Sequence, residues 1–274
     1  MVERELAALL PPLLTGEPVD VVAQLTRPLP LRVVASLLGV ELAGWDALEA
    51  LAHAASTDDT AGESRDELRD RLLAELGVLR FFTARIEGAP AGGEDPRVLP
   101  ELRRAVAAGE ITVREAAGLC REVLVAGADS VGHLMAGALQ VLAGEPERAA
   151  ALRTAPDGLG AFVEERLAAA PPFTGFWRRA TRPTTLGGVD VPQGGLVLVD
   201  YALANRTATR HLSFGHGIHF CLGAALARLE ARIVLGGVLA ATASIAPAGP
   251  AEPLAATSVT GLRTLPLRLR DSAA

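Results

Sequence analysis

Residues 211–223 read HLSFGHGIHFCLG, and apolar residues at helical spacing follow directly over 222–239. This pattern places Cys221 at or just before a helix N-terminus, where free backbone N–H groups and the helix dipole stabilise a thiolate. The three glycines of the stretch lack a Cβ, which permits a tight turn and a close approach to something flat and bulky. A lone cysteine is more often a buried packing residue, but the glycines around this one favour a functional loop.

The spacing F-G-x-G-x-H-x-C-x-G over residues 214–223 resembles the cysteine-ligand loop of the cytochrome P-450 family at each defining position. A thiolate held beneath a flat face is what an axial heme ligand requires. The resemblance runs from near residue 3 to the C-terminus, without the helices and strands that normally open the family's fold. It implies heme b as cofactor, with its iron bound by Cys221, and it places at the heme Phe214, Gly215, His219 and Gly223.

Composition excludes several classes of protein. The net charge of −6 over 274 residues argues against non-specific nucleic-acid binding. Two cysteines cannot form a disulfide framework, and the N-terminus shows no signal peptide, so we expect a cytoplasmic protein. The most apolar stretch, residues 119–142, is interrupted by charged side chains and predicts a core helix and no membrane span.

The spacing of apolar residues predicts a mainly α fold with small β-sheets, and the resemblance implies a truncated cytochrome P-450-like fold. No linker is long enough to divide the chain, so we expect residues 1–274 to form a single domain. Helices are expected over residues 1–15, 66–86, 112–142, 157–170 and 222–239, with one or two more over 19–40. Strand-like segments are expected at 184–191 and 195–201, and apolar alternation near 265–269 resembles the family's C-terminal hairpin.

Small residues flank an acid–hydroxyl pair, Asp129 and Ser130, in the middle of the helix over 112–142. A mid-helix serine can bond back to a carbonyl and distort the helix, and a buried aspartate needs water or a partner. The alternative is an aspartate on a solvated stripe. Gly127, Asp129 and Ser130 match the family's distal-helix motif, which implies that the pair delivers protons to bound oxygen. Cys120 is interpreted as core packing.

The family's Glu-x-x-Arg motif is broken in the helix over 157–170. Glu165 occupies the acidic position, but Ala168 stands where the arginine belongs. Arg166 cannot replace it, because residues three apart share a helix face and Val163 lies three before it. The irregular segment that normally completes this ion network is also missing after Arg206. Two parts of one structural network are therefore absent together.

Further residues match the family's contacts. Arg178 matches the arginine that pairs with a heme propionate, the alternative being a surface arginine, and His219 is a second propionate candidate. Arg228 and Arg232 lie one turn apart on a helix face that is expected to be solvated, together with Glu230. The resemblance implies that a ferredoxin-type redox partner docks on the two arginines.

Three functions remain open from the sequence. The first is a heme-thiolate oxidoreductase, a monooxygenase or peroxygenase that tailors a small molecule in bacterial secondary metabolism. The second is a P-450-like catalyst of a non-oxidative cyclisation, dehydration or rearrangement, and the third is a heme-free auxiliary partner of another biosynthetic enzyme. Without the usual N-terminal elements one side of the pocket should be open, which predicts a homo-oligomer or a complex with a pathway enzyme. The candidate contact residues are leucines of the first helix, namely Leu9, Leu10, Leu13 and Leu14. The alternative is that these leucines pack into the chain's own core.

Overall fold

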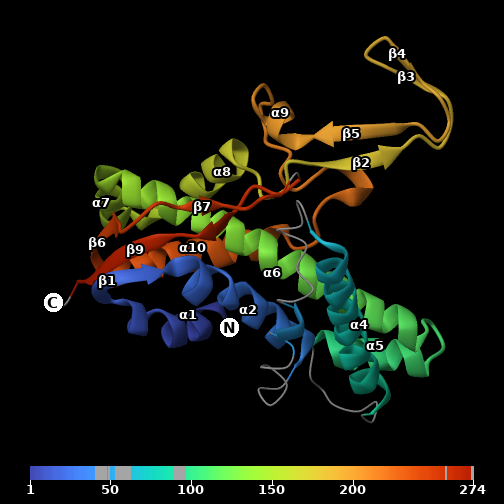
Figure 1. The fold of residues 1–274 in the computed structure, drawn as a ribbon, viewed down its shortest axis with the longest axis horizontal. Coiled ribbons are helices and arrows are strands. Elements are labelled where there is room, and N and C mark those ends of the chain that lie inside the picture. Colours follow the sequence, from blue (N-terminus) through green and yellow to red (C-terminus); the bar gives the residue numbers. More distant parts are fainter. Residues whose placement is uncertain (41–47, 49, 53–62, 89–96, 257, 273–274) are drawn as a thin grey trace.

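The computed structural model describes residues 1–40, 48, 50–52, 63–88, 97–256 and 258–272. It confirms a mainly α protein with small β-sheets, organised around helix α6, Val113–Gly144, which runs through the middle of the molecule (Figure 1). A capping box starts α6: Thr112 Oγ1 accepts from Glu115 N at 3.2 Å, and the Glu115 carboxylate accepts from Thr112 N at 2.8 Å. None of the described helices combines the length and the apolar character that a membrane span needs.

Helix α6 passes from one hydrophobic cluster into another. Its buried residues up to Ala128 belong to a cluster with α2 (Pro28–Leu38), α4 (Arg65–Glu87) and α5 (Val98–Ala107). From Val131 onward they belong to a second cluster, built mainly with α1 (Val2–Leu9), α7 (Pro146–Thr154), α8 (Leu159–Ala169) and α10 (Ala224–Ala241). Asp129 and Ser130 therefore stand at the junction of the two clusters.

A three-stranded antiparallel sheet joins the two ends of the described chain. Its order is β1-β9-β6, formed by Thr15–Asp20, Pro266–Asp271 and Thr242–Pro247. The alternation expected near residues 265–269 is confirmed, since Leu265, Leu267 and Leu269 are all buried. A short pair, β7 (Glu252–Pro253) with β8 (Leu262–Thr264), lies between β6 and β9 in sequence.

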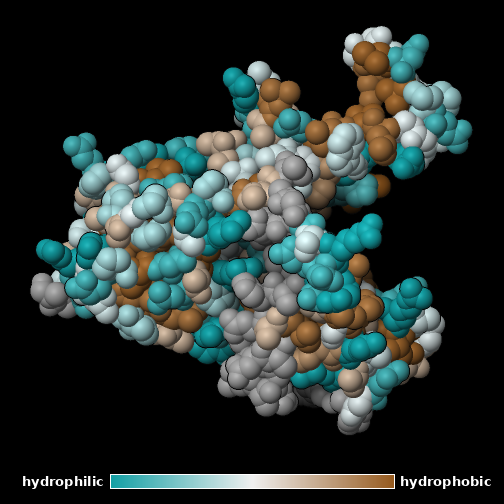
Figure 2. Space-filling model, in the orientation of Figure 1, coloured by the Kyte–Doolittle hydropathy of each residue, from teal (hydrophilic) through white to brown (hydrophobic). Residues whose placement is uncertain are grey.

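A β arm projects from the helical body (Figure 1). Strand β2 (Gly175–Arg179) pairs antiparallel with β5 (Leu196–Asp200), and β3 (Thr184–Leu186) pairs with β4 (Val189–Val191) at its tip. The strand-like stretch expected at 184–191, with a break at Gly187 and Gly188, is a hairpin, because these two glycines turn the chain with φ of +55° and +82°. Apolar side chains gather along this arm (Figure 2), among them Trp177, Leu186, Val189, Leu196 and Leu198.

The N-terminal expectation needs a correction. Helix α1 ends at Leu9, well before residue 15, because Pro11 and Pro12 lack the N–H that would continue it. A 3₁₀ turn and then β1 follow, and the helices expected over 19–40 are a π-helix, Val22–Thr26, and α2. The leucines proposed for an interface pack into the chain's own core, where Leu10 and Leu13 are buried and Leu9 and Leu14 pack against the same cluster.

Candidate functional site

A cavity of about 410 Å³ lies between α6, strand β2, the Cys221 loop and the start of α10. Its walls are mainly apolar or small, and two aromatic rings from the β2 region, those of Phe173 and Phe176, contribute to them. The cavity brings together most of the residues that the sequence singled out, namely Gly127, Ser130, Arg178, Phe214, Gly215, His219, Cys221 and Gly223.

The cysteine loop is folded by its own backbone. Cys221 N donates to Phe214 O at 2.8 Å, and Gly215 N donates to Leu212 O at 2.7 Å. Gly215 has a φ of +72°, and a Cβ there would lie 3.2 Å from His219 O, so this position requires glycine. Cys221 is exposed and lies three residues before Ala224, the first residue of α10. The expected position just before a helix N-terminus is confirmed.

The α6 wall of the cavity carries Gly127 and Ser130. Ser130 Oγ donates to Ala126 O at 2.9 Å, which is the back-bond that the sequence predicted. A Cβ on Gly127 would meet Val34 Cγ2 at 2.7 Å, so this glycine also lets α2 approach α6. Asp129 is half-buried and does not line the cavity. The structure therefore brings Ser130, but not its acidic neighbour, to the wall.

The β2 wall alternates in the manner of a strand. Phe176 and Arg178 line the cavity, whereas Trp177 between them points outward and is 63% exposed. The Arg178 guanidinium donates to Trp177 O at 3.0 Å and lies 5.9 Å from the Phe176 ring centroid. Arg178 is half-buried, and its role toward propionates stays a prediction beside the alternative of a surface arginine.

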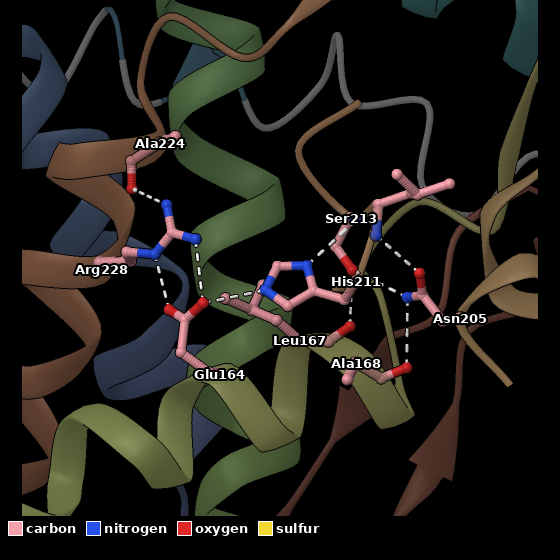
Figure 3. A network of polar contacts seen from close by, with 9 residues as sticks. Glu164, Leu167, Ala168, Asn205, His211, Ser213, Ala224 and Arg228 are labelled. Atoms are coloured by element: carbon pink, nitrogen blue, oxygen red, sulfur yellow. Dashed lines mark hydrogen bonds and ion pairs between the residues drawn. The ribbon is translucent and has the colours of Figure 1, made fainter. Parts of the chain in front are cut away.

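Sequence reasoning missed Glu164, which ties helix α8 to both sides of the cysteine loop (Figure 3). Arg228 donates from Nε to Glu164 Oε1 at 2.6 Å and from Nη2 to Oε2 at 3.0 Å. His211 Nε2 lies 3.0 Å from the same Oε2. The hydrogen bond from Arg228 lowers the pKa of Glu164 to about 2, despite partial burial that acts in the opposite direction.

A second tether lies beside the first (Figure 3). Ser213 Oγ donates to Leu167 O at 2.6 Å, and Asn205 Nδ2 donates to Ala168 O at 3.2 Å. Asn205 Oδ1 accepts from Leu212 N at 2.7 Å. The end of α8 and the start of the cysteine loop are thereby joined through carbonyls that the helix leaves free.

The two arginine contacts correct the sequence interpretation. Arg228 is bound by Glu164 and is no free, solvated cation, whereas Arg232 is exposed as expected. Glu165, the acid of the broken motif, pairs with Arg148 and takes no part in the network around the loop. The Glu-x-x-Arg pair is absent, but its neighbour Glu164 supplies another ion pair one residue earlier on the same helix.

Glu230 was expected in solvent and is instead fully buried on the cavity wall. Neither carboxylate oxygen has a hydrogen-bond partner within the part of the chain that the structure describes. Burial raises the pKa of Glu230 to about 8. Helical spacing could have found it, since Glu230 lies four residues before the buried Val234, on the core face of α10.

Cys120 lies away from the cavity, in the first hydrophobic cluster. It is fully buried, and burial raises the pKa of its thiol to about 12. A thiol of this kind is a small apolar packing group with no tendency to ionise. The interpretation of Cys120 as core packing is confirmed.

The sequence of the chain is similar to those of known cytochrome P450 proteins. Cytochrome P450 144 of Mycobacterium tuberculosis is 34% identical over 235 residues, which are 79% of this chain and 54% of that protein. Cyclomarin C epoxidase CymV of Salinispora arenicola is 30% identical over 272 residues, 92% of this chain and 68% of its own length. The chain thus spans about half to two thirds of such relatives. No family model matches the sequence.

A solved structure agrees along nearly the whole chain. P450BioI, in complex with an acyl carrier protein that carries hexadec-9Z-enoic acid, superposes with a TM-score of 0.88 at 26% identity. The match covers 98% of this chain and 73% of P450BioI.

Proposed function

The chain belongs to the cytochrome P-450 family, whose cofactor is heme b with its iron, and we propose that it is itself a heme-thiolate oxidoreductase. The substrate is a small molecule of bacterial secondary metabolism, and the reaction is that of a monooxygenase or peroxygenase. Such a role is supported by CymV, whose name describes the epoxidation of cyclomarin C. Because the chain spans only part of its relatives, their activity is carried over here as a proposal.

The cavity residues fit a heme. A sulfur donor, Cys221, lines the wall, and the positions around it are kept small by glycines. A Cβ added to Gly223 would lie 3.9 Å from the Cys221 Sγ, in ordinary van der Waals contact, so the backbone at this position passes close to the sulfur. Apolar walls suit the flat face of a macrocycle, and a thiolate is a known axial ligand of heme iron.

The proposed roles follow from these positions. Cys221 would supply the thiolate, and the ring and glycines of residues 214–223 that line the cavity would hold the heme. Arg178 and His219 line the cavity and pair with propionate groups, for which a guanidinium is suited through bidentate contact. Ser130 orders water at the distal wall, and Asp129 exchanges protons with solvent next to it. The heme iron, when bound, supplies the oxidising chemistry.

The observation that carries the proposal is Cys221 on the wall of a cavity whose other side is the α6 segment with Gly127 and Ser130. An absorption spectrum of purified protein, with and without added heme, tests it. We expect a thiolate-type Soret band that shifts on reduction with carbon monoxide and is lost in Cys221→Ser. Cys120→Ala is the matched control and should keep the band, because Cys120 lies in the other cluster. Protein that remains colourless with added heme would refute the proposal.

An acidic, ferredoxin-type redox partner is the electron source we propose. Since Glu164 engages Arg228, the contact is assigned to Arg232, which is exposed on α10. Arg232→Glu should slow reduction by a ferredoxin at low salt, with the difference disappearing at high salt. Equal rates of the variant and the native protein at low salt would remove Arg232 from the partner surface.

A homo-oligomer or a complex with a pathway enzyme stays a prediction, but the contact surface is now expected on the β2–β5 arm and not on the first helix. The first-helix leucines are used by the core, whereas the β2–β5 arm exposes a row of apolar side chains (Figure 2). Exposed apolar rows of this kind are typical of protein contacts. Light scattering at micromolar concentration, with Trp177→Ser as a comparison, tests whether the arm forms the contact.

A further inference from the structure

The cysteine loop is held to helix α8 at both of its flanks by one carboxylate. His211 lies ten residues before Cys221, and Arg228 lies seven residues after it. Both side chains meet Glu164, His211 at 3.0 Å from Oε2 and Arg228 at 2.6 Å from Oε1 (Figure 3). A single substitution at Glu164 would therefore remove one contact from each flank, while the Ser213 and Asn205 bonds to the end of α8 remain.

Arg228 extends this contact into the loop itself. Its guanidinium carbon lies 4.3 Å from the centroid of the Phe214 ring, in a cation–π geometry. Its Nη1 also reaches Ala224 O at 3.4 Å, at the first turn of α10. The His211 and Phe214 rings lie 5.9 Å apart. The guanidinium thus touches the helix, the acid and the loop aromatic that lines the cavity.

Apart from its own backbone bonds and the Ser213 and Asn205 bonds at its start, the loop has few other attachments to the described residues. Residues 216–223 are exposed, and their order rests on the Cys221 to Phe214 hydrogen bond and on the flanks. A segment with many exposed backbone groups and few buried contacts opens locally at low free energy. The bidentate contact between Arg228 and Glu164 at the loop's flank reduces that opening. The His211 side chain at the other flank is only 11% exposed, so its contact with Glu164 is shielded from water.

We propose that Glu164 is a positioning residue for the Cys221 loop. Its contacts with His211 and Arg228 hold the loop to α8 and so replace the ion pair that the broken Glu-x-x-Arg motif lacks. Glu165 cannot do so, because it faces Arg148, and Ala168 carries no charge. The inference deepens the proposed heme-thiolate function and rests on it for its purpose. The contacts themselves exist without heme, so they can be tested in heme-free protein.

The first experiment is hydrogen–deuterium exchange on heme-free protein, comparing Glu164→Gln with Glu165→Gln. The matched pair alters neighbouring carboxylates on one helix, and only the first touches the loop. We expect amides of residues 212–223 to exchange about fivefold faster in Glu164→Gln, the size of effect that one partly exposed ion pair supports, and to be unchanged in Glu165→Gln.

Two results would overturn the proposal. One is unchanged exchange of the loop in Glu164→Gln, and the other is acceleration spread equally through α6, which would indicate only global destabilisation. The double variant Glu164→Gln with Arg228→Gln adds a further check, since two residues that share one contact should accelerate exchange by less than the sum of their separate effects, even though Arg228 also contacts Phe214. Simple additivity of the two effects would also contradict a shared contact.

The second experiment asks whether the loop geometry reaches the cysteine. Heme is titrated into the three proteins, and each is reduced under carbon monoxide to compare thiolate-type with neutral-ligand absorption. Glu164→Gln should show a larger neutral-ligand fraction than the native protein and Glu165→Gln at equal heme content. Equal fractions in all three would overturn the positioning role. Native protein that takes up no heme would refute the proposed function, while the exchange result would still decide the contact.

Discussion

Glu164 and Glu230 stand on two helices in contact, α8 and α10, and have opposite acidities. The pKa of Glu164 is lowered to about 2, and that of Glu230 is raised to about 8. Glu164 keeps 42% of its side chain exposed and has two partners. Glu230 is 0% exposed, and its two oxygens have no partner among the described residues.

The difference shows that burial decides the charge state of Glu230, whereas its partners decide that of Glu164. Burial raises the pKa of both groups, but at Glu164 the hydrogen bond from Arg228 outweighs it, with His211 adding to the effect. Arg228 and Glu230 are two positions apart on α10, and this spacing directs their side chains to different sides of the helix and so to different environments. The first carboxyl is a permanent anion and the second holds its proton at neutral pH.

The largest effect is expected for Glu230→Gln. Because the folded-state pKa is raised from 4.5 to about 8, the native protein keeps a proton that the unfolded chain loses, so its stability falls as pH rises through this window. A neutral glutamine of similar shape removes this dependence. We expect the variant to gain on the order of a few kcal/mol over the native protein at pH above 8 and nothing below about 4.5.

Urea unfolding of heme-free protein at a series of pH values measures this gain. Glu164→Gln is a suitable control, since it should not alter the slope between pH 5 and 8. A Glu230→Gln variant that follows the native curve in parallel across the window would show that the carboxyl is ionised in the folded protein.

A smaller effect of opposite sign is expected for Glu164→Gln. The folded-state pKa is lowered, so the stabilisation is fully present above the unfolded value of 4.5 and is lost as pH falls toward about 2. With partial exposure of both partners the loss at neutral pH should be about 1 kcal/mol. Native and variant unfolding curves should converge in acid, and a constant difference down to pH 2 would contradict the ion pair.

The sequence predicted the fold and the cavity wall well, because both rest on periodic or tightly spaced residues. The expected helices over 66–86 and 157–170 correspond to α4 and α8, and the cysteine loop lies at the N-terminus of α10. The first helix was predicted too long, since its apolar spacing continues past Pro11 and Pro12 although the backbone cannot.

The sequence could not predict which glutamate pairs with which arginine. Glu164 and Glu165 are adjacent and chemically identical, and a family motif favoured Glu165. Their faces are set by the packing of α8, which buries Phe162, Val163 and Leu167 and turns Glu164 toward α10. For Glu230, polarity favoured solvent, but its place on the core face of α10 decided its burial.

The smallest effect on stability is expected for Glu165→Gln. It makes the same substitution as Glu164→Gln at the next position, so a difference between the two variants reports the position alone. Glu165 pairs with Arg148 on the exposed side of α8, and Arg148 also pairs with Glu145 at 3.3 Å and lies 4.6 Å from the Phe162 ring centroid. Removing one carboxylate therefore leaves the guanidinium well partnered, and exposed pairs of this kind contribute little. Urea unfolding at neutral pH should differ from the native protein by less than about 0.5 kcal/mol. A loss as large as that of Glu164→Gln would show that the two neighbours carry equal weight, and that the contrast between them does not come from the loop.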